Sequence, residues 1–298
     1  MIRLAHLSDV HVTTAKLDWR LRDWFSKRYP GWINYRLLGR RYRFRRADEV
    51  LRVLGDELRQ GRFDRLIFSG DATAMGFESE FRRAATLLRV ADPAMPRGLA
   101  VPGNHDYYTR RVAASGLFER YFGSWQQGER VDGSYYPFAQ RVGHVWLVAV
   151  NSCTGNRWPW DAAGSAGAEQ RRRLAQLLRS LDSGPRILIT HYPVCLSTGA
   201  KEPRTHNLRD LRELVQVATE GGVSLWLHGH RHGAYFLEQP ALAPFPVVCA
   251  GSATQSRHWS YGAYTIDGLN FHAQRRVFSA HRLCFEDGPA FALVLRDT

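Results

Sequence analysis

The four residues Gly103-Asn104-His105-Asp106 decide how this sequence of 298 residues is interpreted. They follow the short apolar run 98–101, which has the composition of a buried strand. A turn after a strand uses the Gly-Asn pair but has no need of the His-Asp pair that follows it. The motif therefore indicates a functional site at the carboxyl end of a strand.

Four further polar clusters also follow apolar runs that have the pattern of strands. They are Asp9-Val10-His11 after 2–7, Gly70-Asp71 after 65–68, His191 after 186–189, and His228-Gly229-His230-Arg231-His232 after 223–227. Ligands of open α/β sheets bind outside the carboxyl ends of strands, so we expect these side chains to meet. An extended backbone would direct both side chains of Asp9-x-His11, and both of His230-x-His232, to one face. We expect Gly70, Gly103 and Gly229 to provide sharp turns at the strand ends.

The residue types in these clusters are metal ligands. Asp, His and Asn supply the oxygen and nitrogen atoms that suit manganese, iron or zinc. Taken singly, each cluster also fits a plainer interpretation, because a lone Asp is often a turn or cap residue and a lone histidine often lies in the core or on the surface. The histidine run also fits a surface metal-binding tract, although it follows a buried strand. Together, in this order, the five clusters predict a metal site.

The ordered set Asp-x-His, Gly-Asp, Gly-Asn-His-Asp, His and Gly-His-x-His resembles the fingerprint of the calcineurin-like metallophosphoesterases. The resemblance implies an α/β fold, a four-layer α/β/β/α sandwich of two mixed β-sheets flanked by helices, with a dinuclear metal site at the strand ends. The resemblance further implies two sets of ligands, Asp9, His11 and His232 for one metal and Asn104, His191 and His230 for the other. Asp71 would bridge the two metals, and His105 would lie beside the substrate phosphate.

Hydrolysis of a phosphate ester requires both charge neutralisation and a nucleophile. Two metals about 3.5–4 Å apart supply both, because they clamp the phosphate and lower the pKa of bound water towards about 7. The expected reaction is in-line attack of a metal-bridging hydroxide on a phosphodiester, or on a phosphomonoester or pyrophosphate. We expect His105 to act as a catalytic donor to the phosphoryl or leaving oxygen. Asp106 is expected either to orient His105 or to cap a helix that begins near Thr109.

Other functions fit the same metal chemistry. A nuclease is one alternative, and a membrane-associated pyrophosphatase acting on lipid phosphates or nucleotide-linked lipids is another. The Ser/Thr protein phosphatase branch of the family is disfavoured, because Ala74 stands where that branch has an acid. A non-catalytic binding module is disfavoured as well, because no ligand position is lost. The expected partner is a phosphate-ester substrate, and the sequence predicts no particular oligomeric state.

The rest of the chain predicts one domain, residues 1–298, with an insertion at about 16–46. Helical periodicity covers 46–58, 78–90, 110–122, 169–181 and 208–219, and additional strands are expected at 134–139 and 144–150. The remainder, to the last residue, alternates in a strand-like way, with turns expected at Asp267-Gly268 and Asp287-Gly288. Early alternation of strands and helices followed by strands indicates sheets that are covered by helices.

The insertion holds most of the net charge. The chain has 41 basic and 28 acidic residues and a formal charge of +13, of which residues 16–46 carry +9 through eleven basic and two acidic residues. Leu17, Leu21, Trp24 and Phe25 are spaced as one face of a helix, which Pro30-Gly31 is expected to break. Three interpretations stay open: a cap packed on the body with its charges in water, a helix lying on anionic lipid, or a nucleic-acid-binding segment.

The composition indicates the cellular compartment of the protein and excludes some structural classes. The four cysteines lie far apart without a Cys-x-x-Cys pair, which argues against a disulfide scaffold or a structural zinc site. The longest apolar run, 145–150, is far shorter than the ~20 residues of a membrane span. The N-terminal residues have no secretory pattern. We therefore expect a cytoplasmic protein, peripheral at the inner membrane surface if the insertion binds lipid.

Overall fold

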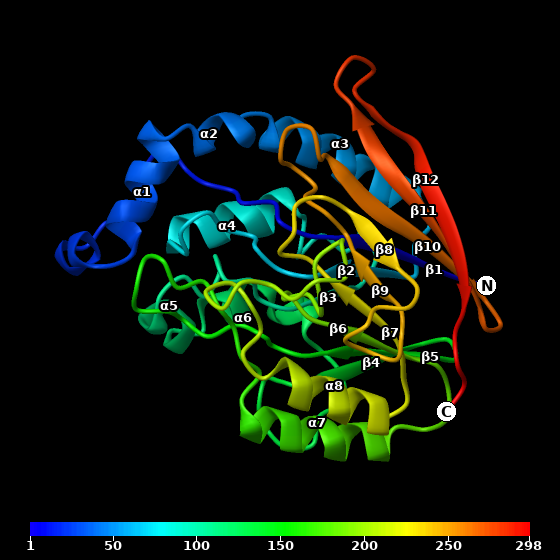
Figure 1. Ribbon diagram of the computed structural model, residues 1–298. Helices are drawn as coiled ribbons and strands as arrows, with labels where there is room; N and C mark the ends of the chain where they lie inside the picture. The colour runs from blue at the N-terminus through cyan, green and yellow to red at the C-terminus, as the bar shows by residue number, and fades with distance from the viewer.

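Apolar strands pair into two six-stranded mixed sheets in the computed structural model, which describes residues 1–298 (Figure 1). The first sheet has the order β12-β11-β10-β1-β2-β3, with the bounds β1 Ile2–Leu7, β2 Arg65–Phe68, β3 Gly98–Ala100, β10 Ser260–Asp267, β11 Asn270–Ser279 and β12 Cys284–Val294. The second has the order β4-β5-β6-β7-β9-β8, with the bounds β4 Phe138–Val142, β5 Val145–Ala149, β6 Arg186–Ile189, β7 Val223–His228, β8 Tyr235–Leu237 and β9 Val247–Cys249. In the first sheet the strands β1, β2 and β3 are parallel and the strands from β1 to β12 are antiparallel neighbours. In the second sheet the parallel strands β5, β6, β7 and β9 lie in the interior, and β4 and β8 are antiparallel edge strands.

Helices cover the outer face of each sheet. The helices α3 Ala47–Gln60, α4 Glu78–Leu87 and α6 Leu117–Phe122 pack on the first sheet, and α7 Ala168–Ser180 and α8 Leu211–Glu220 pack on the second. Successive strand residues face opposite layers, so Leu4 lies between the two sheets and Ala5 lies under the helices. In the same way Leu147 faces the other sheet and Val148 faces α7 and α8. The predicted four-layer α/β/β/α architecture is confirmed.

Three local predictions were wrong. The helix expected at 110–122 is divided into α5 Arg110–Ala114 and α6, because Gly116 adopts a left-handed φ of 63° between them. Asp287-Gly288 lies inside β12 rather than at a turn, opposite a register shift in β11. The strand expected at 134–139 begins at Phe138, directly after Pro137, whose nitrogen has no proton to donate to a neighbouring strand. The turn at Asp267-Gly268 is present and joins β10 to β11.

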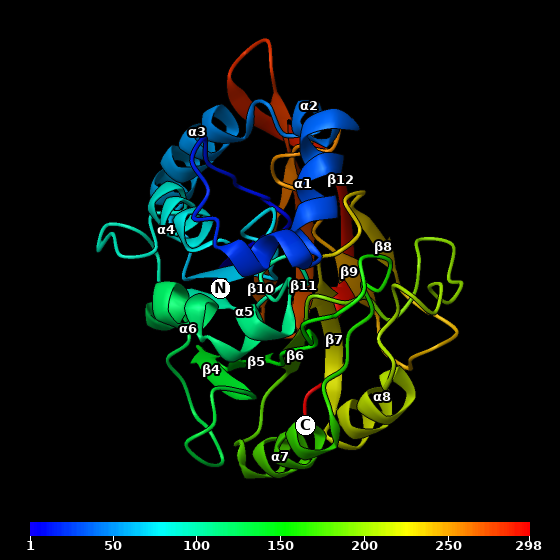
Figure 2. The ribbon, with the colours of Figure 1, turned by 90° about the vertical axis from the view of Figure 1, so that its left-hand side faces the viewer.

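Residues 16–46, which we call the cap, lie between β1 and α3. They form a short 3-10 helix η1 Leu21–Phe25, then α1 Arg28–Leu37 and α2 Arg40–Arg43, on the side of the molecule that faces the viewer in Figure 2. Pro30 does not break a helix, because it is the third residue of α1, where the backbone nitrogen has no partner within the helix. The single amphipathic helix expected from Leu17 to Phe25 is absent.

The cap is attached to the body by a small apolar cluster and by hydrogen bonds from the buried Arg28. Leu17, Trp19 and Trp32 pack against a cluster on the body that consists of Ala74, Met75, Phe77 and Tyr108. The Asp23 carboxylate accepts a hydrogen bond from Arg28, whose Nη1 lies 2.9 Å away, and Arg28 also donates to the carbonyl oxygen of Met75. These contacts turn Asp23, and not its apolar neighbours, towards the body.

Candidate metal centre

The first predicted ligand set converges at the carboxyl ends of β1 and β7. The Nε2 atoms of His11 and His232 are 3.1 Å apart, and Asp9 Oδ1 is 3.7 Å from the first and 3.4 Å from the second. Asp9 and His11 are buried, and His232 is half-buried. One carboxylate oxygen and two imidazole nitrogens therefore surround a single point.

The second set lies beside it, at the ends of β3, β6 and β7. Asn104 Oδ1 is 3.0 Å from His191 Nε2 and 2.9 Å from His230 Nδ1, and those two ring nitrogens are 3.3 Å apart. Asp71 lies between the two sets, with its Oδ2 atom 3.6 Å from His11 Nε2 and 3.5 Å from His191 Nε2. All seven predicted ligands therefore lie within one cluster, and Asp71 has the central place expected of a bridge.

Hydrogen bonds fix the tautomers of the histidines so that an unprotonated nitrogen faces the centre. The Nδ1 atoms of His11 and His191 are paired with the carbonyl oxygens of Thr73 at 3.3 Å and Ser69 at 2.8 Å, which leaves each Nε2 without a proton. His232 Nδ1 is paired with Gln255 Oε1 in the same way. His230 is reversed, since its Nδ1 faces the centre and its Nε2 lies 3.7 Å from Glu202.

The charges of the cluster fit a cation. Asp9 Oδ1 is fully buried and has no hydrogen-bond partner, which is costly unless a positive group lies beside it. Burial alone would raise the pKa of Asp9, but the imidazoles of His11 and His232 beside it outweigh burial and hold that pKa well below the usual range, so the carboxylate is ionised. Burial lowers the pKa of His11 to about 3, so the imidazole is neutral. Burial and the charges of Asp9 and Asp106 raise the pKa of Asp71. A bound cation would relieve this repulsion between carboxylates.

The backbone that carries the ligands is strained, and here our expectation was wrong. Asp9, His11, Asp71 and His230 have positive φ angles of 55°, 44°, 61° and 66°. The side chains of Asp9 and His11 thus meet through left-handed turns after the strand, and not through an extended backbone. Non-glycine residues in this region cost about 1–3 kcal/mol each and cluster at functional sites.

The glycines act more through size than through turning. Of the three expected turn residues, only Gly70 has a positive φ, of 101°. A Cβ atom on Gly103 would lie 2.0 Å from Asp71 Oδ1, and one on Gly229 would lie 2.7 Å from Asp9 Oδ2. Gly103 and Gly229 are therefore needed for the close approach of the ligand loops, which the sequence did not reveal.

His105 and Asp106 have different places. The His105 ring faces the centre edge-on to His11, with Nδ1 2.6 Å from the carbonyl oxygen of Ala74. The Asp106 carboxylate is fully buried and accepts hydrogen bonds from the backbone nitrogens of Gly103, Ala72 and Thr73. It contacts neither the His105 ring nor the start of α5. The N-cap residue of α5 is Thr109, whose side chain accepts a hydrogen bond from the backbone nitrogen of Val112. Asp106 instead joins the loop that carries Asp71 to the loop that carries His105.

The sequence profile of the calcineurin-like phosphoesterase family matches residues 2–234 of this chain. That range includes all seven predicted ligands. The chain belongs to this family. Comparison with curated protein sequences gave no match.

Solved structures have the same fold as this calcineurin-like phosphoesterase. A dimetal phosphatase from Danio rerio has a TM-score of 0.67 at 14% identity, with 99% of each chain covered. A purple acid phosphatase, PPD1, from seeds of yellow lupin (Lupinus luteus) has a TM-score of 0.61 at 12% identity, over 98% of this chain and 53% of that one. GAP50, the anchor in the inner membrane complex of Plasmodium, has a TM-score of 0.59 at 11% identity, over 99% of this chain and 89% of that one.

Some residues of the site were not identified by the sequence motifs. They come from the cap and from the loop after β9. Arg40 Nη2 lies 3.1 Å from His105 Nε2 and 3.4 Å from His11 Nδ1. Phe44 packs edge-on against the His11 ring at a centroid distance of 4.9 Å, and Gln255 pairs with His232. Arg40 belonged to the basic run in the sequence, but no spacing connected it with the strand ends.

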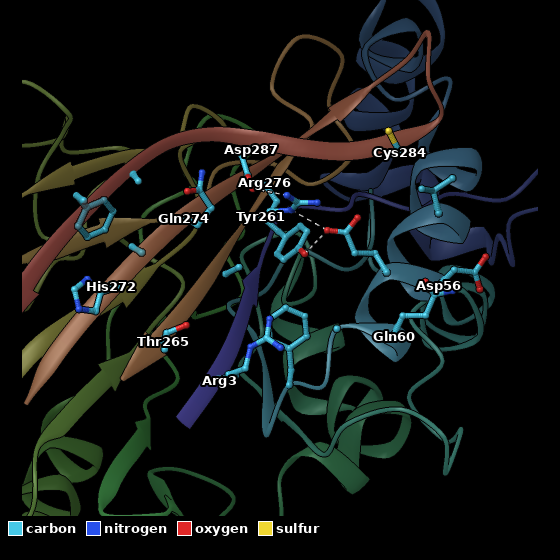
Figure 3. Close-up of a pocket in the computed structure, with 18 of the residues that line it drawn as sticks. Arg3, Asp56, Gln60, Tyr261, Thr265, His272, Gln274, Arg276, Cys284 and Asp287 are labelled. Atoms are coloured by element: carbon cyan, nitrogen blue, oxygen red, sulfur yellow. Dashed lines mark hydrogen bonds and ion pairs between the residues drawn. The ribbon is translucent and has the colours of Figure 1, made fainter. Parts of the chain in front are cut away.

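A large cavity of the phosphoesterase lies away from the metal centre. It has a volume of about 900 Å3 and lies between α3 and the strands β10 to β12, with no metal ligand in its lining (Figure 3). Its charged groups pair with one another, since Glu57 accepts hydrogen bonds from Tyr261 at 2.7 Å and from Arg276 at 2.9 Å. The chemistry of a phosphoesterase therefore belongs to the ligand cluster and not to this cavity. No helix is long and apolar enough to span a membrane.

Proposed function

We propose that this protein hydrolyses phosphodiester bonds with two divalent or trivalent cations, of manganese, iron or zinc. Asp9, His11 and His232 would hold one cation, Asn104, His191 and His230 the other, and Asp71 both. When bound, the cations neutralise phosphate charge and provide a nucleophile near neutral pH. The observation that supports this proposal most strongly is the convergence on one point of the ionised Asp9 carboxylate, the neutral imidazole of His11 and the ring of His232.

Arg40 supports a diester as the substrate. Its guanidinium contacts two histidine nitrogens and forms no ion pair with a carboxylate, so it is free to bind an anion. The planar guanidinium matches the two non-bridging oxygens of a diester, which carry one negative charge together. Two nearby arginines are already engaged, because Arg28 pairs with Asp23 and Arg231 pairs with Glu202, whereas Lys27 donates only to the carbonyl oxygen of Asp161. A guanidinium that binds two oxygens of one phosphate suits a diester, in which only two oxygens are free of ester bonds.

His105 and Asp106 have separate roles in this proposal. His105 Nε2 accepts a hydrogen bond from Arg40 at 3.1 Å, so a phosphate oxygen bound by Arg40 would lie beside the imidazole. We therefore assign His105 the catalytic role of donating a proton to the phosphoryl or leaving oxygen once Nε2 is protonated, because Nδ1 is bound to the carbonyl oxygen of Ala74. Asp106 is a positioning residue, because its carboxylate fixes the backbone around Asp71 and His105 through amide hydrogen bonds.

The test compares substrate classes on one enzyme preparation. Bis-p-nitrophenyl phosphate, p-nitrophenyl phosphate, a nucleotide pyrophosphate and single-stranded DNA would be assayed with manganese, iron and zinc, each with the metal content measured. We expect the highest kcat/KM for the small diester, and activity that a chelator removes and manganese restores. Preference for the monoester would refute the diester assignment. Preference for DNA, falling steeply with salt, would favour the nuclease instead.

A further inference from the structure

The cap exposes large apolar side chains to water on the side shown in Figure 2. Leu21 and Phe25 of η1 are 81% and 88% exposed, and Trp24 between them is also exposed. In η1 the side chain that turns inward is that of Asp23, which pairs with the buried Arg28. The apolar neighbours of Asp23 therefore point outward, although exposing them to water is unfavourable.

A second exposed apolar segment adjoins η1. Trp158 and Trp160 are 49% and 64% exposed, and their rings stack at a centroid distance of 5.1 Å. Lys27, two residues after η1, donates a hydrogen bond of 3.0 Å to the carbonyl oxygen of Asp161 and so holds this loop against the cap. We call the five side chains Leu21, Trp24, Phe25, Trp158 and Trp160 the docking face.

Exposed basic residues surround the docking face. Arg20 and Arg22 flank Leu21, and Arg157 precedes the tryptophan pair. In the whole cap the exposed basic residues are Lys16, Arg20, Arg22, Arg36, Arg41, Arg43 and Arg45, against a single exposed acid, Asp18. Aromatic and aliphatic side chains bordered by arginines form the pattern that inserts at the interface of an anionic bilayer, where the rings enter the headgroup layer and the guanidinium groups bind phosphate.

We propose that the docking face binds the surface of an anionic phospholipid bilayer. The positive charge around the face complements lipid phosphates, and its rings and aliphatic chains match the boundary between headgroups and acyl chains. The same cap carries Arg40 to the metal centre, so docking brings the centre close to the membrane. If the proposed hydrolysis is correct, on which this last step rests, the substrate is a phosphoester presented at the bilayer surface.

Co-sedimentation with vesicles tests the docking directly. The full protein would be mixed with vesicles of phosphatidylcholine alone or with added phosphatidylglycerol. We expect strong binding only with phosphatidylglycerol, and weaker binding as salt is raised. The double variant Leu21→Ser/Phe25→Ser should bind at least about tenfold more weakly, because two apolar side chains no longer insert. Arg20→Gln/Arg22→Gln should lose about tenfold in binding to the anionic vesicles.

The matched control is Leu283→Ser/Val294→Ser, which removes two exposed aliphatic side chains outside the docking face, one in the turn between β11 and β12 and one at the end of β12. It should bind vesicles as the unchanged protein does. All variants should hydrolyse a soluble diester at the normal rate, which separates a failure of docking from a failure of the proposed function.

Three results would overturn the proposal. One is binding that does not depend on phosphatidylglycerol or on the docking face. Another is a dimer in light scattering that Leu21→Ser/Phe25→Ser dissociates while vesicle binding is absent, since the face would then bind a second copy. The last is tight binding of oligonucleotides, abolished by Arg20→Gln/Arg22→Gln, without binding to vesicles.

Discussion

In the metal centre, buried polar side chains from five strand ends face one another, whereas in the cap most charged side chains face water. Asp9, Asp71 and His191 are almost fully buried, and each has partners from distant parts of the chain. The cap is held by one small apolar cluster and by hydrogen bonds of Arg28 and Lys27 to backbone carbonyl oxygens of the body. The difference shows that the fold itself brings the candidate ligands together, while the cap is an addition that contributes two side chains, Arg40 and Phe44, to the centre.

Removal of the bridge should have the largest effect. Asp71→Ala deletes the carboxylate that lies between both ligand sets, so both cations lose a ligand. We expect kcat/KM for a diester to fall by about a thousandfold or more, which corresponds to about 4 kcal/mol. Metal content measured by mass spectrometry should fall as well. Asp182→Ala, at an exposed acid far from the centre, should change neither quantity.

Crowding the centre should have the next largest effect. A Cβ atom on Gly103 would lie 2.2 Å from the backbone nitrogen of Asp71, so Gly103→Ala must displace one of the two loops. We expect a loss of about 3 kcal/mol in the free energy of unfolding by urea, together with weaker metal binding. Gly133→Ala is the control, since a Cβ atom there meets nothing within 4 Å. Equal stability of the two variants would show that the loops are more pliable than the structure indicates.

Removal of the contact between cap and centre should have the smallest effect of the three. Arg40→Gln keeps a polar side chain but removes the positive charge beside His105. We expect kcat/KM for a diester to fall by about 30-fold to 100-fold, as for a charged hydrogen bond worth about 2–3 kcal/mol. Metal content should stay unchanged. Arg41→Gln, at the exposed neighbouring position, should alter kcat/KM for the soluble diester by less than about twofold; similar losses in both variants would mean that only the general charge of the cap matters.

The same contrast explains what could be predicted from the sequence. The convergence of the seven candidate ligands was predictable because strand ends in an α/β sheet meet at one edge, and motifs such as Gly103-Asn104-His105-Asp106 identify those ends. The left-handed turns at Asp9 and His11 were not predictable, because nothing in the sequence indicates that a residue other than glycine will adopt a positive φ.

The structure of the cap was less predictable because contacts with other segments decide where its side chains point. The spacing from Leu17 to Phe25 indicated one helix face, yet Leu17 packs on the body while Leu21 and Phe25 are exposed. Arg40 was one of many arginines in the run, and only the structure places it beside His105. Helical periodicity predicts a helix that lies on a single surface. The cap bends instead, so that some of its apolar side chains contact the body and others face water.

Anomalous diffraction from crystals grown with manganese tests the central claim most directly. The account predicts two manganese peaks per chain, one among Asp9, His11 and His232, the other among Asn104, His191 and His230, with Asp71 between them. A single peak, or peaks outside this cluster with the seven side chains unliganded, would contradict it.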